Sequence, residues 1–296
     1  MPTALINGAR INYVQVESEE SRDDLVMVHG LATSLAFWYF PYASIFARRY
    51  RVTVFDLRGH GRSEMTAGGY SPQAQAADLE GLMDHLGIDS AHFVAHSFGG
   101  VLALGLAKRA PARIDSLVLC DSQISATRHM PIETWGHSQL IQTLLDRHGI
   151  DLDAQSPFFG YELLTEVAKL LQRGQELHPD LVELVGPTLG KHPRKTALRW
   201  LDLVSLAEVE LTHDDALTPD VLRAMRFPTL ALYGERSKAC ATRDLLRPLW
   251  PMASFTTVPN AGHFFPASRS EEVIAACEAF WNDLELTTST THRVAV

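Results

Sequence analysis

A serine that could act as a nucleophile follows an apolar run in the first third of the chain. The run covers residues 91–95 and is typical of a short buried strand, and a helical pattern begins at Phe98. Ser97 therefore lies in a sharp strand-to-helix turn that continues into Gly99 and Gly100. Such a turn, a nucleophile elbow, lifts the hydroxyl off the end of the sheet and directs the next amide toward a developing oxyanion. Alone, Ser-x-Gly-Gly also fits an ordinary strand-helix connection.

Further apolar runs have the length of buried strands and alternate with helical patterns. They cover residues 25–28, 52–55, 117–120, 229–233 and 254–258. Strands that alternate with helices indicate a parallel sheet that carries helices on both faces. With the run before Ser97 and a hairpin at the N-terminus, we expect an α/β fold with a mostly parallel, eight-stranded sheet.

Local signals define the hairpin and one of the helices. Asn7-Gly8 is a two-residue turn signal and joins Ala4–Ile6 to Arg10–Glu17. A helix should run from Ser71-Pro72 to Leu86, because serine caps a helix and proline fits its first turn. The glycine that follows Leu86 should end this helix.

The alternation stops between residues 122 and 226, where helical periodicity dominates and no strand pattern is clear. Examples of this periodicity are Leu140–Arg147, Glu162–Arg173 and Leu198–Val209. About a hundred residues are too many for a loop inside a compact domain. We therefore predict a core domain of residues 1–121 and 227–284, with a helical cap of residues 122–226 inserted into it. The last helix should end near residue 284, and residues 285–296 should form a flexible tail.

Taken together, four motifs in this order resemble the α/β-hydrolase family across residues 4–284. They are His29-Gly30, Asp56-x-Arg58-Gly59-x-Gly61-x-Ser63, His96-Ser97-Phe98-Gly99-Gly100 and Gly262-His263, and each follows a predicted strand. The family usually has glycine two residues before the nucleophile. Here Ala95 stands at that position, and its small side chain should still permit the turn.

The resemblance implies a serine hydrolase with a catalytic triad, and the motifs indicate which residues would take part. Ser97 would be the nucleophile and His263 the general base, because a serine hydroxyl needs a neutral imidazole to take its proton. The backbone amides of Leu31 and Phe98 would form the oxyanion hole. His29 and His60 are expected to fix loops by hydrogen bonds.

The third member of the triad is not at its usual position. The family commonly has Gly-x-x-Asp after the strand before the histidine, and this chain has Gly234-Glu235-Arg236-Ser237 there. A neutral hydroxyl cannot balance an imidazolium, so Ser237 cannot replace the acid. We predict that Asp121, at the end of the strand after the elbow, is the acid, as in some relatives. Glu235, a dyad without an acid, or a cap residue remain alternatives.

Candidate substrate-binding residues are mostly aromatic. His96 is expected to pack beside the elbow or to form a wall of the pocket, and Trp38 could line the pocket or belong to the core. In the cap, the candidate walls are Trp135, Phe158, Phe159, Tyr161 and Trp200, which could equally form the core of the cap itself.

The predicted activity is hydrolysis of an ester, lactone, thioester, activated amide or carbon–carbon bond in a largely apolar organic substrate. The position of the acid keeps a cofactor-free dioxygenase open as an alternative, in which a His-Asp pair would deprotonate a hydroxylated heteroaromatic. A binding protein that has kept the fold is a third reading, and the presence of both Ser97 and His263 argues against it.

Composition limits the partners and the location. The net charge is −9 and basic residues do not cluster, so we expect a small-molecule substrate and no nucleic acid. No apolar run is long enough for a membrane span, and the first residues do not resemble a signal peptide. With 3 cysteines, the sequence favours the cytoplasm. We expect no metal and no cofactor, and a homodimer remains open.

Overall fold

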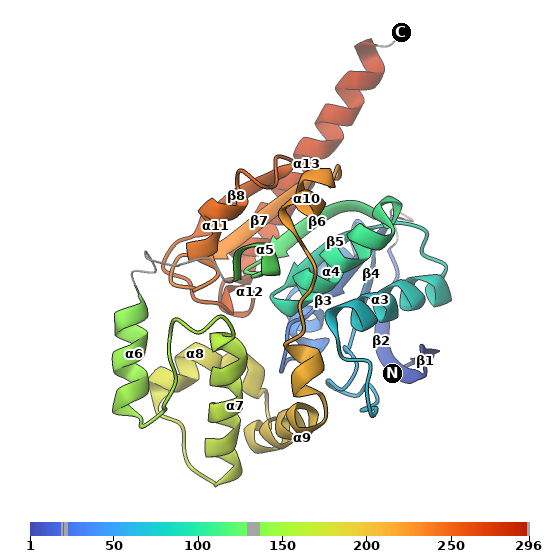
Figure 1. The fold of residues 1–296 in the computed structure, drawn as a ribbon. Coiled ribbons are helices and arrows are strands. Elements are labelled where there is room, and N and C mark those ends of the chain that lie inside the picture. Colours follow the sequence, from blue (N-terminus) through green and yellow to red (C-terminus); the bar gives the residue numbers. More distant parts are fainter. Residues whose placement is uncertain (19, 21–22, 129–136, 295–296) are drawn as a thin grey trace.

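The computed structural model describes residues 1–18, 20, 23–128 and 137–294, and its centre is one eight-stranded sheet (Figure 1). The strand order is β1-β2-β4-β3-β5-β6-β7-β8. The pairs β1–β2 and β2–β4 are antiparallel, and every pairing from β4 to β8 is parallel. The strands are β1 Thr3–Ile6, β2 Ala9–Val16, β3 Asp24–Val28, β4 Arg51–Phe55, β5 Ala91–His96, β6 Ile114–Cys120, β7 Thr229–Gly234 and β8 Ala253–Val258. This confirms the predicted α/β fold class.

The two turn signals act as the sequence predicts. Asn7 and Gly8 both have positive φ, of 46° and 79°, which a type I′ hairpin turn between β1 and β2 requires. Helix α3 spans Pro72–Leu86, and the side chain of Ser71 caps it by accepting the N–H of Ala74. Gly87 ends it in the left-handed conformation.

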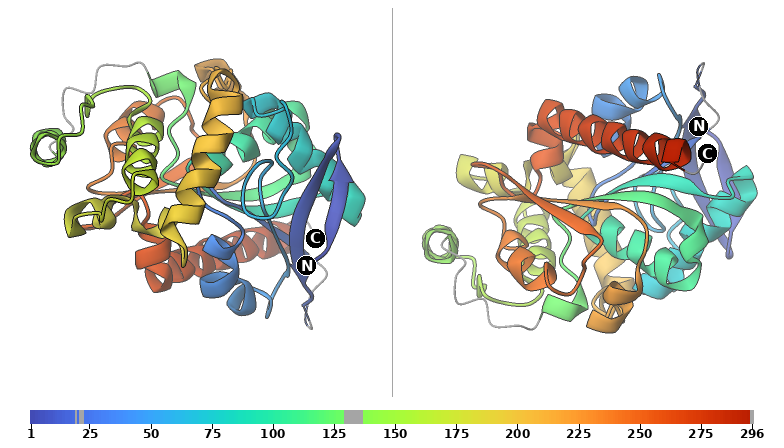
Figure 2. Two further views of the ribbon diagram at one scale, coloured as in Figure 1. Left: turned by 90° about the horizontal axis from the view of Figure 1, so that it is seen from below. Right: turned by 90° about the horizontal axis from the view of Figure 1, so that it is seen from above.

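Both faces of the sheet are covered, and the strands send alternate side chains to the two layers (Figure 2). Val26 and Val28 of β3 join the layer of α3 and α4, whereas Leu25 and Met27 join the opposite layer. Three further elements lie on the side of α3. Helix α4 Phe98–Arg109 and the 3-10 turn Pro111–Arg113 follow β5, and helix α11 Cys240–Leu246 follows β7. The opposite layer contains α1 Ala36–Trp38, the π-helical segment Tyr39–Ala43, α2 Ser44–Phe46, α12 Phe265–Ser268 and α13 Ser270–Val294.

The segment between β6 and β7 is helical. Its middle helices form two apolar clusters, one of which also includes Ala32 and Tyr70, whereas Ile124 and Leu222 near its ends join the core layer of α3 and α4. Its helices are α5 Ser125–Arg128, α6 Ser138–Arg147, α7 Phe159–Gln172, α8 Pro179–Leu189, α9 Pro193–Leu211 and α10 Pro219–Ala224. We call residues 122–226 the helical insertion. It lies over loops that follow two different strands. Leu203 lies against Gly59 and Arg199 donates to the carbonyl of Ser63, both after β4, and Lys238, after β7, donates to the carbonyl of Ala154.

Because those loops follow β4 and β7, the insertion covers the carboxyl edge of the parallel strands, as Figure 1 also shows. Open α/β sheets bind their ligands at this edge. Helix α8 was not among the helices predicted from the sequence, although proline is favoured in the first turn of a helix and Pro179 stands there.

The C-terminal helix is longer than expected. Helix α13 continues to Val294, past the predicted end near Leu284, and its last turns project from the body of the protein (Figure 1). The threonine-rich end contains no glycine or proline, so nothing in it interrupts a helix that has already formed. The flexibility expected for residues 285–296 stays a prediction.

Candidate active site

Ser97 occupies the strained turn between β5 and α4. Its φ of 54° and ψ of −121° are unusual for a residue with a side chain, and such strain is typical of functional sites. Hydrogen bonds fix the turn, because the amide of Ser97 donates to the carbonyl of Cys120 at 2.9 Å and its own carbonyl accepts the hydroxyl of Ser122 at 2.8 Å. A Cβ added to Gly99 would lie 2.4 Å from the carbonyl oxygen of Val28, so only glycine lets α4 pack this closely on β3.

Three side chains predicted to act together form one hydrogen-bonded chain. Nε2 of His263 lies 3.0 Å from Oγ of Ser97, and Nδ1 of His263 lies 2.6 Å from Oδ2 of Asp121. A carboxylate only accepts, so Nδ1 carries the proton and Nε2 accepts the proton of the serine hydroxyl. Parallel pairing of β5 with β6 aligns His96 with Cys120, and this register brings Ser97 and Asp121 to the same edge of the sheet.

Asp121 is fully buried, and four groups in all determine its position. Its Oδ1 accepts the amide of Gly234 at 2.8 Å, and its Oδ2 accepts the hydroxyl of Ser237 as well as Nδ1 of His263. The amide of Asp121 itself donates to the carbonyl of Leu232 at 2.8 Å. Ser237 holds the position that is usual for the acid in the family. Its hydroxyl contacts the carboxylate of Asp121, which lies beside it.

Glu235 faces a different partner. Its side chain is exposed, and its Oε2 accepts the amide of Asn260 at 2.6 Å. This bond joins the loop after β7 to the loop that carries His263. No contact between Glu235 and His263 occurs among the hydrogen bonds and ion pairs of the described residues.

His96 lies behind His263. Its ring stacks on Phe37 at 4.9 Å between centroids, and its Nε2 donates to the backbone carbonyl of His263 at 2.9 Å. Burial holds the pKa of His96 well below its usual value, so the ring is neutral. His96 therefore fixes the loop of His263 from within the core.

His29 fixes the backbone that passes Ser97. Its Nε2 accepts the amide of Leu57 at 3.1 Å, so Nδ1 carries the proton and donates to the carbonyl of Gly30 at 2.8 Å. Burial lowers the pKa of His29 to about 4, which keeps the ring neutral. In a trans peptide the amide of Leu31 points away from the carbonyl of Gly30. A Cβ added to Gly30 would lie 3.0 Å from Cβ of Ser97, so this peptide runs directly beside the serine.

A comparison with known families agrees with this geometry. The model of the alpha/beta hydrolase fold family matches residues 25–268. The chain belongs to this family. It is an enzyme of the hydrolase class, as the named relatives also indicate. Among the described residues, no helix is both long and apolar enough to cross a membrane.

Two curated relatives show how far the similarity extends. This hydrolase is 31% identical over 170 residues to a putative carbamate hydrolase, RutD, of Pantoea ananatis, and that match covers 55% of this chain and 60% of the relative. It is 27% identical over 281 residues to the mouse sn-1-specific diacylglycerol lipase ABHD11, covering 91% of this chain and 84% of the lipase.

Solved structures give the same fold. Est816, described as an N-acyl homoserine lactone degrading enzyme, has a TM-score of 0.66 and 25% identity, over 94% of this chain and all of that one. The enol-lactonase of Burkholderia xenovorans LB400 also has a TM-score of 0.66, at 23% identity over 95% of this chain and 100% of that one. The latter likeness concerns the fold alone.

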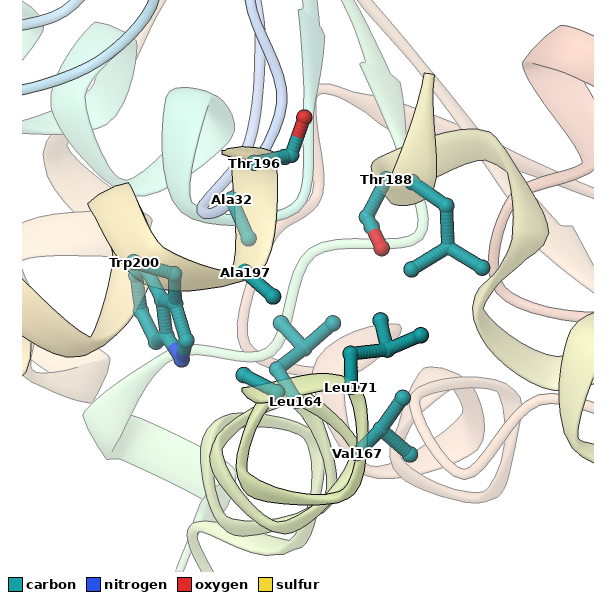
Figure 3. A pocket seen from close by; sticks show the side chains of 10 residues that line it. Ala32, Leu164, Val167, Leu171, Thr188, Thr196, Ala197 and Trp200 are labelled. Carbon is teal, nitrogen blue, oxygen red and sulfur yellow. The ribbon is translucent and has the colours of Figure 1, made fainter. Parts of the chain in front are cut away.

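A small hollow of about 20 Å³ lies between helices α7 and α9 of the hydrolase (Figure 3). Figure 3 shows side chains of α7 facing those of α9, with Ala32 of the core domain beside them. Its walls are almost entirely apolar and include Ala32, Leu164, Val167, Leu171, Ala197 and Trp200. Ala32 follows Leu31 directly, so the hollow begins one residue from the peptide that passes Ser97.

Of the aromatic residues suggested by the sequence, Trp200 lines this hollow, and the ring of Tyr161 packs against that of Trp200 with 5.6 Å between centroids. Trp38 is fully buried on one face of the sheet, and Phe159 belongs to the apolar cluster of the insertion. Phe158 lies under the guanidinium of Arg128, at 5.5 Å. Trp135 falls outside the described residues. Sequence reasoning missed Leu164, Val167, Ala168 and Leu171, although their helical spacing marks one face of α7.

His60 takes no part in the chain of hydrogen bonds. Its Nδ1 bonds the carbonyl of Arg58 at 3.0 Å, and its ring lies 5.6 Å from that of His29. Burial lowers its pKa to about 3. This agrees with the expected role of fixing a loop.

Proposed function

We propose that this hydrolase cleaves an ester or lactone bond through an acyl-enzyme intermediate. The single observation that carries the proposal is the chain from Ser97 through His263 to Asp121, with distances of 3.0 and 2.6 Å. Both distances are those of well-formed hydrogen bonds, and the proton positions are those that a general base needs. Thioesters, activated amides and carbon–carbon bonds react through related steps and define the wider substrate range.

Each residue has one role in this mechanism. Ser97 attacks the substrate carbonyl while Nε2 of His263 takes its proton, and the negative charge that forms on the carbonyl oxygen is stabilised by the amides of Leu31 and Phe98. Phe98 is the first residue of α4, so its amide has no acceptor within the helix. The imidazolium then protonates the leaving group. Water, activated by His263, releases the acyl group from Ser97 in the second half of the reaction.

Asp121 is the acid of the proposed triad. Its buried carboxylate holds Nδ1 of His263 and would balance the charge of the imidazolium that forms during attack. Ser237 supports it by donating to the same oxygen. The exposure of Glu235 and its bond to the amide of Asn260 argue against this role for Glu235.

The helical insertion acts as the cap, and the hollow between α7 and α9 would widen to receive the apolar part of the substrate. The support is that Ala32, one of its lining residues, follows Leu31 of the proposed oxyanion hole in sequence, and that its described lining residues carry no charged side chain. An uncharged acyl chain fits such walls. Two of the relatives described above are named for lactone and acylglycerol substrates. Both of these are esters, the class of substrate proposed for this enzyme.

Hydrolysis of p-nitrophenyl esters with acyl chains of two, four and eight carbons tests this proposal. Each methylene buried in the hollow contributes up to about 0.8 kcal/mol, so kcat/KM should rise by as much as about fourfold per methylene until the hollow is filled. Ala197→Phe should abolish the preference for long chains and spare the acetate, whereas Leu206→Phe, on the exposed side of α9, should change neither.

Ser97→Ala should abolish turnover of every ester. Full activity in this variant would refute the acyl-enzyme. Consumption of oxygen with a hydroxylated heteroaromatic, together with no ester hydrolysis, would instead favour the dioxygenase alternative.

We also propose that the enzyme acts in the cytoplasm. The small and odd number of cysteines in the sequence supports a reducing compartment. Detection of the protein by antibody in fractions of the native cell tests this location, and recovery from an extracellular fraction would contradict it.

A further inference from the structure

Two helices of the insertion bring a pair of histidines together. His148 follows the last residue of α6, and His178 caps the start of α8. Their ring centroids are 4.6 Å apart. One nitrogen of each ring and one carboxylate oxygen of Asp180 all lie within 4.8 Å of one another. These three residues are the only group of this kind among the residues that the structure describes.

Apolar packing fixes the elements that carry these side chains. Leu145 of α6 and Leu181 of α8 are 0% and 2% exposed and belong to the same apolar cluster, three residues from His148 and His178 respectively. Gly149 has a φ of 64°, which turns the chain sharply after His148. Buried apolar contacts therefore help to hold the ends of the two helices close to each other.

The polar atoms of the group are poorly satisfied by the protein. Nε2 of His148 is buried and has no hydrogen-bond partner among the described residues, which is unusual for a buried ring nitrogen. Nδ1 of His178 lies 3.3 Å from both the amide and the carboxylate of Asp180, longer than a good hydrogen bond. A ligand that accepts lone pairs would satisfy these nitrogens.

We propose that His148, His178 and Asp180 form a binding site for a divalent transition-metal ion, with Zn²⁺ as the best match. Two imidazole nitrogens and one carboxylate oxygen are a donor set that Zn²⁺ accepts at about 2.0 to 2.2 Å, and water completes the coordination. The donors must approach each other by about 1 Å or more for such bond lengths. His178 and Asp180 have side chains that are 50% and 42% exposed, so they are free to rotate inward.

One cation competes for the carboxylate. Nη1 of Arg147 lies 3.7 Å from Oδ2 of Asp180, but its side chain is 63% exposed and such surface ion pairs are weak. A bound ion would displace it and join the C-terminal end of α6 to the N-terminal end of α8. The site is structural and lies within the insertion, so it revises the expectation of no metal. It does not depend on the proposed function.

Calorimetric titration of the full-length, EDTA-treated protein with ZnCl₂ at pH 7.5 tests the site. We expect one ion per chain and a higher melting temperature in its presence. His148→Ala, His178→Ala and Asp180→Asn should each weaken binding by about tenfold or more, since even residues that only support a metal ligand have effects of this size.

His192→Ala is the matched control, because His192 is an exposed histidine that precedes α9 as His178 precedes α8. It should bind Zn²⁺ as the wild type does. Circular dichroism of each variant verifies folding, and Asp180→Asn keeps the test valid if the loss of a histidine disturbs the insertion. The proposal is overturned if the wild type binds no ion, or if the three variants bind Zn²⁺ as tightly as the control.

Discussion

Replacement of Asp121 by asparagine should inactivate the enzyme, and the structure determines how the amide must lie. Oδ1 of Asp121 accepts the amide of Gly234 at 2.8 Å, and a backbone N–H can only donate. The side-chain oxygen of asparagine must therefore face Gly234, which leaves its NH₂ group facing His263. Because NH₂ donates, Nδ1 of His263 must accept, and the ring proton moves to Nε2. Nε2 then has no lone pair for the proton of Ser97.

The expected loss is large in rate and small in stability. The same exchange in the triad of a serine protease lowers kcat by about four orders of magnitude, or about 5.4 kcal/mol in the barrier. The fold should survive, because asparagine has the size of aspartate, keeps the bond to Gly234 and lets the hydroxyl of Ser237 rotate to accept the NH₂ group. We therefore expect a melting temperature within a few degrees of the wild type.

Glu235→Gln is the control for this experiment. Its carboxylate is exposed and bonds Asn260, so the substitution should change kcat by less than about tenfold. The assay is p-nitrophenyl ester hydrolysis at pH 7.5, with circular dichroism melting curves for both variants. A crippled Glu235→Gln beside a nearly normal Asp121→Asn would refute the assignment of the acid.

Three further predictions concern the surroundings of the site. Ser237→Asp in the Asp121→Asn background should recover at least about tenfold in kcat, since an aspartate there extends one bond further toward the imidazole; no recovery would show that position 237 cannot hold the acid. Gly99→Ala would place its Cβ 2.4 Å from a carbonyl oxygen of β3, and overpacking of this kind should destabilise the fold by about 1 to 3 kcal/mol in urea unfolding, so an unchanged midpoint would contradict the close packing of α4. Burial lowers the pKa of His29 to about 4 and that of His60 to about 3, so below about pH 6.5 the unfolded chain binds protons that the folded protein does not. The free energy of unfolding should therefore fall by roughly 2 to 3 kcal/mol for each ring between pH 7.5 and 4.5. A flat pH profile in urea unfolding would contradict these pKa shifts.

The sequence predicts the fold and the arrangement of Ser97, His263 and Asp121 because these depend on local patterns. Apolar runs define the strands, and the carboxyl ends of parallel strands meet at one edge of the sheet, so strand-end residues must converge there. The register of β5 and β6 then aligns Ser97 with Asp121. The strands and their common edge follow from the order of elements and the geometry of a parallel sheet, whereas the choice of Ser97 and His263 came from the resemblance to the α/β-hydrolase family.

Other features depend on contacts between distant parts of the chain, which no local pattern encodes. The sequence analysis rejected Ser237 as an acid, and only the folded loop after β7 shows that its hydroxyl contacts Asp121. His96 was expected to pack near the elbow, but its bond to the carbonyl of His263 requires the loop after β8. His148 and His178 follow no ligand motif because they come from two different helices.

Covalent labelling with a fluorophosphonate, followed by intact-mass spectrometry and peptide mapping, tests the central claim most directly. The account predicts one adduct per chain, on Ser97, formed in parallel with the loss of esterase activity. Ser97→Ala should take up no label, and Asp121→Asn should react far more slowly than Glu235→Gln. A label on another residue, or full esterase activity in Ser97→Ala, would contradict the claim that Ser97 is the nucleophile.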